Sequence, residues 1–143
     1  MRRTVLLDAA PFCYGPISTL MAVAQQLRSA DIDLVLLASG TAAEFVRTEQ
    51  TWLRVVTCNT EDIADLGRIR HLFFDAAVFV CNTNPISAGF ARTLGCRVVY
   101  IDTLFWMWDR IDPLVASSEL YLAQDFAGMN RPHPISGHSS PQW

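Results

Sequence analysis

Polar and aromatic side chains gather in four short segments, each directly after an apolar run of strand length. These segments are Asp8–Gly15, Ser39–Gly40, Asn82–Asn84 and Asp102–Asp112. In an open parallel sheet, ligands bind outside the carboxyl ends of the strands. We therefore expect these segments to form the functional surface, which could be a substrate site or a partner surface.

The first segment turns into a helix at Gly15-Pro16. It has one glycine, so neither GxGxxG nor GxxxxGK[ST] is present, and NAD, FAD or ATP bound in those ways is not expected. The exposed helix start, with Ser18 and Thr19 nearby, could bind an anion or a hydroxyl-rich ligand. A tight turn before an ordinary helix explains the same residues equally well.

Three amides and hydroxyls, Asn82, Thr83 and Asn84, form the third segment. Their side chains can hydrogen-bond a ligand, but the same residue types also cap helices. Asn84 directly precedes Pro85, a residue favoured in the first helical turn. Capping is therefore the better interpretation of Asn84.

The fourth segment carries three large aromatics, Phe105, Trp106 and Trp108, between Asp102 and Asp109. Aromatic side chains in a loop either pack beneath a neighbouring element or form a platform for a ring-shaped ligand. Packing is the commoner arrangement, and the sequence leaves both open.

Strand-like apolar runs alternate with helical patterns along the chain. This alternation predicts an α/β protein with a single Rossmann-like, doubly wound, mainly parallel sheet of about six strands and helices on both faces. The expected strands are Thr4–Ala9, Asp33–Ser39, Trp52–Cys58, Ala76–Asn82, Cys96–Asp102 and Glu119–Asp125; helices are expected over Pro16–Ala30, Thr41–Gln50 and Pro85–Leu94, with a weaker helical or loop segment after Thr60.

We assign residues 1–127 to this domain and 128–143 to a disordered tail or the start of a linker. The tail holds three of the seven prolines and has no apolar periodicity. It also holds His133 and His138, but the composition does not favour a metal site there. The four cysteines lack metal-like spacing and are expected to be free thiols.

The overall composition excludes several classes of partner. The net charge is −3 and the 11 basic residues are scattered, which argues against nucleic acid. No apolar run is long enough to span a bilayer, and Asp8 interrupts the N-terminal run, so a cytoplasmic protein is expected. Charged residues make up only 17% of the chain, which suggests that another domain or chain covers part of its surface.

The order of "VLLDAAPFCYGPISTLMAVAQQL", "DLVLLASG", "AAVFVCNTNP", "VVYIDTLFWMWD" and "ELYLAQDF" resembles the N-terminal half of GT-B glycosyltransferases. In that family this half binds the acceptor, and a second Rossmann-like half binds the nucleotide sugar. Nothing after Phe126 resembles the second half. The resemblance thus implies the acceptor-binding half of a transferase, truncated or needing a separate donor-binding half, with a small-molecule or glycan acceptor.

The resemblance also implies roles for individual residues. Gly15 matches the glycine of the family's G-H-x-x-P turn, but Pro16 stands where many members have the catalytic histidine. The base would then be Asp8, Asp102 or Asp109. Asp102 is the best placed of the three, although bracing its own loop explains it equally well. The implied acceptor pocket comprises Phe12, Tyr14, Gly15, Thr83, Asn84, Phe105, Trp106 and Trp108.

A second hypothesis assigns no catalytic activity to the chain. The missing histidine and missing second half both favour a non-catalytic Rossmann-like module that binds a small molecule or a partner protein.

Overall fold

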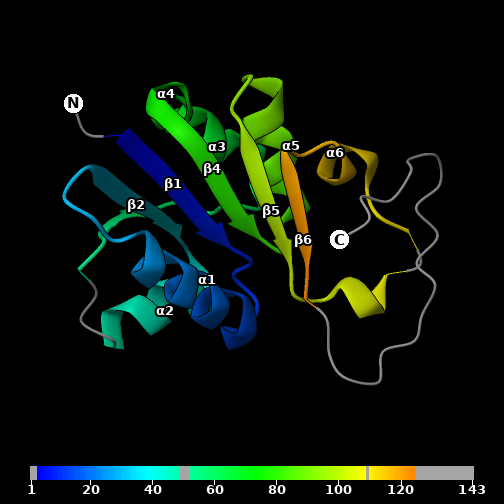
Figure 1. The fold of residues 1–143 in the computed structure, drawn as a ribbon, viewed down its shortest axis with the longest axis horizontal. Helices are drawn as coiled ribbons and strands as arrows, with labels where there is room; N and C mark the ends of the chain where they lie inside the picture. The colour runs from blue at the N-terminus through cyan, green and yellow to red at the C-terminus, as the bar shows by residue number, and fades with distance from the viewer. Residues whose placement is uncertain (1–2, 49–51, 109, 125–143) are drawn as a thin grey trace.

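The computed structural model describes residues 3–48, 52–108 and 110–124, which form a parallel sheet covered by helices (Figure 1). The sheet has six strands in the order β3-β2-β1-β4-β5-β6, and every neighbouring pair is parallel. The predicted α/β, Rossmann-like fold is therefore confirmed. The elements are β1 (Arg3–Ala9), α1 (Tyr14–Leu27), β2 (Ile32–Ala38), α2 (Gly40–Thr48), β3 (Arg54–Thr57), α3 (Ile63–Arg68), α4 (Arg70–Asp75), β4 (Ala76–Asn82), α5 (Pro85–Thr93), β5 (Val98–Asp102), the 3-10 turn η1 (Phe105–Met107), α6 (Pro113–Ala116) and β6 (Leu120–Ala123).

The central strands are buried on both faces, which explains their continuous apolar runs. Along β1, Val5 and Leu7 contribute to the core on one side of the sheet, while Leu6 contributes to the core on the other. Because side chains alternate along a strand, an unbroken apolar run can fill two cores at once. This double burial fixes β1 in the middle of the sheet.

The helices divide unequally between the two faces (Figure 1). α1 and α2 pack with β1 and β2 on one face, through Ile17, Leu20 and Val46. α3, α4, α5 and α6 belong to the other core, where the rings of Phe73 and Phe79 meet edge to face at 5.2 Å. The first face thus carries fewer helices than the second.

Several element boundaries differ from those expected. The first helix begins earlier than predicted, after Cys13 as its N-cap. The weak segment after Thr60 forms two short helices, and η1 and α6 follow no periodic pattern in the sequence. The predicted cap is confirmed, since the Asn84 side chain accepts a hydrogen bond from the Ser87 backbone N–H at 3.4 Å.

Two predictions lie outside the described residues, namely the tail 128–143 and the candidate base Asp109. The assignment of 1–127 to one domain stays a prediction. Within the described ranges, no helix is both long and apolar enough to cross a membrane.

The loop between β1 and α1 is tied to the start of α2. The Pro11 carbonyl accepts hydrogen bonds from both the backbone N–H and the hydroxyl of Thr41. Gly40 makes this approach possible, because it has a φ of +51° and a Cβ there would lie 2.7 Å from the Pro11 oxygen. The Pro11–Thr41 contact therefore depends on the absence of a side chain at Gly40.

We expect Gly40→Ala to lower the free energy of unfolding by about 1–2 kcal/mol through its left-handed φ alone, with a further loss from the contact with Pro11. Gly15→Ala is the matched control, because a Cβ there meets nothing within 4 Å. Urea unfolding of both variants measures the difference. Equal stabilities would show that the contact does not constrain the loop.

Candidate functional site

From β1 the sheet extends in one direction through β2 and β3, and from β4 it extends in the opposite direction through β5 and β6. β1 and β4 are neighbours, yet α1 and α5, which follow them, lie on opposite faces. A crevice therefore opens between the two connections at the carboxyl ends of the strands, where open α/β sheets bind ligands.

A cavity of about 530 Å³ lies at this edge of the sheet. Its volume falls within the usual range for small-molecule sites, about 300–1,000 Å³. One wall is the start of α1 and the other is the chain around η1 and the end of β6. The lining residues are Cys13, Gly15, Pro16, Ser18, Thr19, Thr103, Leu104, Trp106 and Gln124. None of them carries a carboxylate, an imidazole, an ammonium or a guanidinium group.

Buried amides and hydroxyls beneath the cavity join its two walls. The Asn82 amide donates to the Pro16 carbonyl at 2.8 Å, so β4 holds the first turn of α1. The hydroxyls of Thr83 and Thr103 lie 2.8 Å apart, and that of Thr83 also donates to Asn82. Thr83 has a φ of +56°, an uncommon conformation for a non-glycine residue that occurs most often at functional sites.

Asp8 is fully buried on the α5 side of the sheet and does not line the cavity. Its carboxylate accepts hydrogen bonds from the Ser87 hydroxyl and, at 3.0 Å, from the Asn84 amide. Burial raises the pKa of Asp8 to about 7, although these hydrogen bonds oppose the shift. Asp8 therefore binds its proton more tightly in the folded chain than in the unfolded chain.

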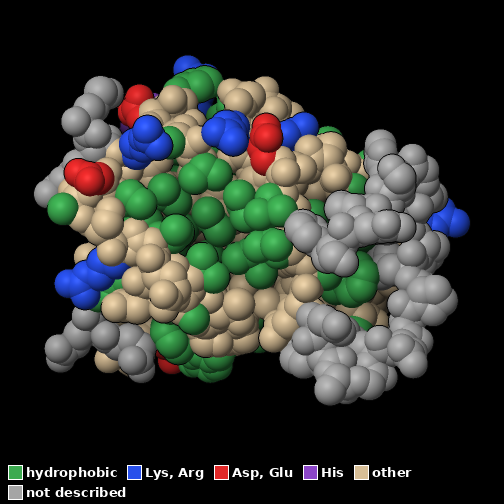
Figure 2. Space-filling model, in the orientation of Figure 1, with side chains coloured by type: hydrophobic (Ala, Val, Ile, Leu, Met, Phe, Trp, Pro, Cys, Tyr) green, Lys and Arg blue, Asp and Glu red, His purple; other side chains and the backbone are tan. Residues whose placement is uncertain are grey.

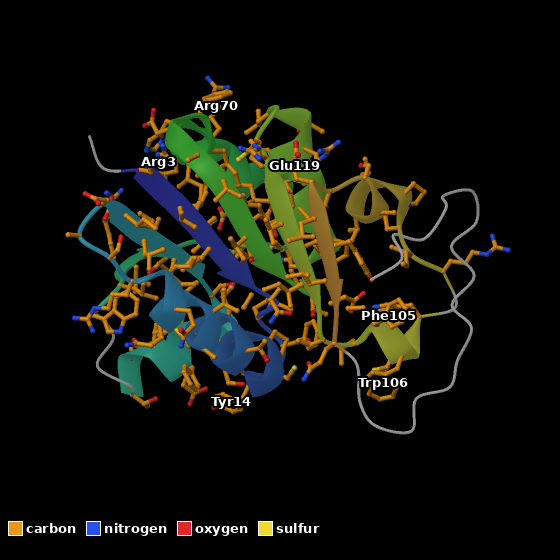
Figure 3. All side chains as sticks on the ribbon, viewed as in Figure 1. Arg3, Tyr14, Arg70, Phe105, Trp106 and Glu119 are labelled. Carbon is orange, nitrogen blue, oxygen red and sulfur yellow. The ribbon has the colours of Figure 1, made fainter. Side chains whose placement is uncertain are left out.

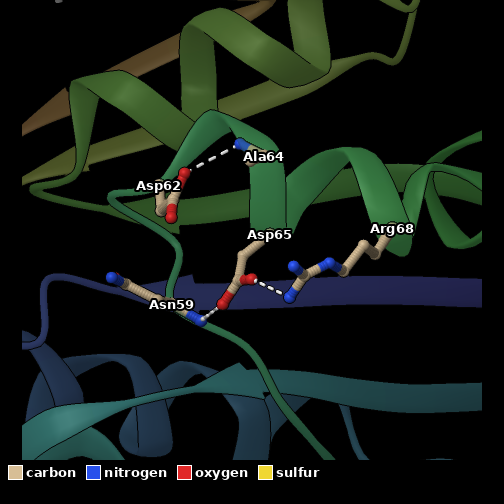
Figure 4. A network of polar contacts seen from close by, with 5 residues as sticks. All are labelled: Asn59, Asp62, Ala64, Asp65 and Arg68. Carbon is tan, nitrogen blue, oxygen red and sulfur yellow. Dashed lines mark hydrogen bonds and ion pairs between the residues drawn. The ribbon is translucent and has the colours of Figure 1, made fainter.

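The loop after β3 supports this buried group. Asp62 caps α3 by accepting from the Ala64 N–H at 2.8 Å, and Asp65 accepts from Arg68 and from the Asn59 N–H (Figure 4). This exposed network fixes the loop that carries Thr60, whose hydroxyl lies 3.0 Å from the Asn84 amide. The network is structural, and it lies on the side of the sheet opposite α1.

Asp102, the favoured candidate base, braces the aromatic loop. Its carboxylate accepts from the Trp108 indole N–H at 3.0 Å, from the Tyr121 hydroxyl and from the Leu104 N–H at 3.0 Å. Burial and this carboxylate raise the pKa of Tyr121, which keeps the hydroxyl protonated as a donor. The bracing role that the sequence left open is thus the one seen in the structure.

The predicted pocket residues are only partly brought together (Figure 3). Gly15 and Trp106 line the cavity, whereas Tyr14 is turned toward α2, where its hydroxyl donates to Glu44 at 3.2 Å. Phe105 packs edge to face on Tyr121. Phe12 and Trp108 are exposed but do not line the cavity, and Thr83 and Asn84 are buried beneath the strand ends.

The aromatic loop is not a core element. Trp106 and Trp108 are each 41% exposed, so neither is buried beneath a neighbouring element, whereas Phe105 packs on Tyr121. The sequence assigned no site role to Ser87, Thr60 or Gln124, and it indicated Thr103 only as part of the segment Asp102–Asp112. Gln124 follows β6 directly, so the strand-end rule could have identified it too.

No family model and no curated protein matches the chain. Among the solved structures, the crystal structure of the GsuK RCK domain matches with a TM-score of 0.54 and 17% sequence identity. The match covers 85% of this chain and only 26% of the other chain. At this identity it establishes the fold alone.

The prediction of a GT-B acceptor half is wrong, because the matching structure is an RCK domain and not a glycosyltransferase. The strand–helix alternation and the Gly15 turn that suggested the family are general features of Rossmann-like folds. The predicted glycosyltransferase activity depended on that resemblance and is not supported either. Nothing supports a separate donor-binding half or a binding site for a sugar acceptor.

We expect the free energy of unfolding to fall as pH rises from about 4 to about 7 and then to level off. In this window the folded chain keeps the Asp8 proton and the unfolded chain loses it, so unfolding releases a proton. Asp8→Asn keeps the group neutral and should flatten the slope. Urea unfolding at about pH 5 and about pH 8 measures it.

Asp33→Asn is the control, because Asp33 has a half-exposed side chain and only a 3.9 Å contact with Arg54. It should retain the slope of the unsubstituted chain. A slope that survives in Asp8→Asn would show that Asp8 is not the titrating group.

Proposed function

We propose that this chain is a non-catalytic Rossmann-like module that binds a small, uncharged, ring-bearing molecule in the cavity between α1 and η1. The observation that carries the proposal is the lining, whose described residues combine an aromatic ring with hydroxyl and amide groups and include no side chain charged at neutral pH. A charged ligand would lose part of its hydration on entering the cavity and would meet no countercharge on the described lining residues. Transfer of an unpaired charge from water to a partly enclosed site costs free energy.

The polar groups of the lining suit a ligand with hydroxyl or carbonyl substituents. Ser18, Thr19 and Thr103 supply hydroxyls, and Gln124 supplies both a donor and an acceptor. Trp106 offers a large flat surface on which a ring can stack, with about 0.5–1.5 kcal/mol beyond its area burial. The ligand class follows from this combination.

A binding role accounts better than catalysis for the two described aspartates at the strand ends. Asp102 is occupied by donors from Trp108 and Tyr121, and Asp8 is sealed beneath α5. Neither lines the cavity. A general base must reach the proton that it removes, so these carboxylates do not suit that task.

A dinucleotide is also a poor fit. Rossmann dinucleotide sites place an acidic residue near the end of the second strand for the ribose. Here β2 ends at Ala38 and is followed by Ser39 and Gly40, and the adjoining loop is closed by the Pro11–Thr41 contact. The proposed ligand therefore occupies only the side of the crevice toward β5 and β6.

We expect neutral ring-bearing probes, such as adenosine and indole-3-carboxamide, to shift the amide resonances of Gly15, Thr19 and Thr103 in proton–nitrogen NMR spectra. Thr19→Glu should abolish the shifts, since it adds a charge to the cavity wall. Trp106→Ala should weaken binding by about tenfold through lost stacking.

Thr93→Glu is the matched control, because Thr93 is exposed on α5, on the other face. AMP serves as the anionic counterpart of adenosine. Tighter binding of AMP, or shifts that persist in Thr19→Glu, would contradict the proposed ligand class.

A further inference from the structure

On the α1 side, α1 packs on β1 and β4, and no described helix packs closely on β5 or β6. Aliphatic side chains of β4, β5 and β6 lie on this side of the sheet, and we call them the open half-sheet: Val78, Val80, Val99, Ile101, Leu120 and Leu122. Leu120 and Leu122 are 37% and 39% exposed and Val78 and Val99 are partly buried, whereas Val80 and Ile101 are buried in the core that α1 shares. Figure 2 shows this surface as a gathering of hydrophobic side chains, with charged side chains along its upper edge.

The neighbouring helix is also unusual for a surface helix. α1 has 14 residues and contains no Asp, Glu, Lys or Arg. Its exposed residues include Ser18, Ala22 and Gln25, all uncharged. By contrast, α2 carries Glu44 and Arg47. A surface helix typically carries charged and polar residues on its outer face, so the absence of charge from α1 is compatible with a covered helix.

One flank of α1 faces the open half-sheet. Thr19 lines the cavity together with Gln124, which follows β6, so this flank points toward β5 and β6. Val23 lies one turn further along on the same flank and is only partly buried. An uncharged surface therefore extends from α1 toward β5 and β6.

A two-fold axis allows two copies to interlock. A helix layer is about 10 Å thick, so α1 stands as a ridge beside the lower strands β5 and β6. Rotation about a two-fold axis that runs parallel to the strands, between α1 and these strands, places α1 of each copy over β5 and β6 of the other.

We propose that a second copy of this chain covers the open half-sheet, in an isologous dimer in which α1 of each copy packs on β5, β6 and the uncovered part of β4 of the other. Val23 then lies near the axis, and Ala22 of one copy faces Leu122 of its partner.

The area indicates a moderate affinity. A 14-residue helix is about 21 Å long and about 10 Å wide, so α1 and the strands beside it together offer each copy about 400 Å² of projected area. The accessible area of a surface covered with side chains is larger than its projection, yet at most near the 800 Å² per partner of a standard interface. We expect dissociation constants in the micromolar range.

Sedimentation velocity of the full chain across micromolar concentrations tests the proposal. The unsubstituted chain should shift from monomer to dimer, and Leu122→Glu and Ala22→Lys should each be monomeric. Leu114→Glu is the control, because Leu114 is 51% exposed and belongs to α6 on the opposite face. It should dimerise as the unsubstituted chain does.

Mixing the two monomeric variants distinguishes this arrangement from others. In the mixed dimer, one contact is unsubstituted and the other pairs the introduced lysine with the introduced glutamate. The mixture should therefore regain the dimer that each variant alone has lost. Circular dichroism confirms that both variants fold. A monomeric or aggregated unsubstituted chain, dimers that survive either substitution, or a mixture that stays monomeric would each overturn the proposal.

Discussion

The right-handedness of the parallel crossovers is the constraint on which the rest of this structure depends. From β1 the chain moves outward to β2 and β3, which places α1 and α2 on one face. From β3 it crosses back to β4 and proceeds to β5 and β6, which places α3 to α6 on the other face. The crevice between β1 and β4 and the sparse helix cover over β5 and β6 on the α1 side are both consequences of this one rule.

The same rule explains how much of the fold the sequence could predict. Continuous apolar runs such as Leu34–Ala38 can be buried only between two layers, so the number and type of strands followed directly. The cap at Asn84 was also predictable, because its chemistry is local. The turn η1 and the short helix α6 were not, since both depend on contacts with Tyr121 and α5 that lie far away in the sequence.

The candidate site, like the fold, could be predicted from the sequence only in part. Rules that concern strand ends predicted the edge of the sheet at which the cavity lies, and they indicated Gly15 and Trp106, which line it. They could not say which way a side chain points. Tyr14 turns to Glu44 on α2, and Asp102 turns to Trp108 and Tyr121, because tertiary partners decide these directions. The likeness to a transferase failed for a related reason, since it rested on a backbone pattern that proteins of many functions share.

The tie between Pro11 and Thr41 bears on how the two walls of the cavity are held. It links the loop that leads into α1 to the start of a second helix, α2. The opposite wall contains the three-residue 3-10 turn η1, whose hydrogen-bond geometry is poorer than that of an α-helix, and Asp102 braces it through Leu104 and Trp108. One wall is therefore anchored through a neighbouring helix, and the other through a single carboxylate.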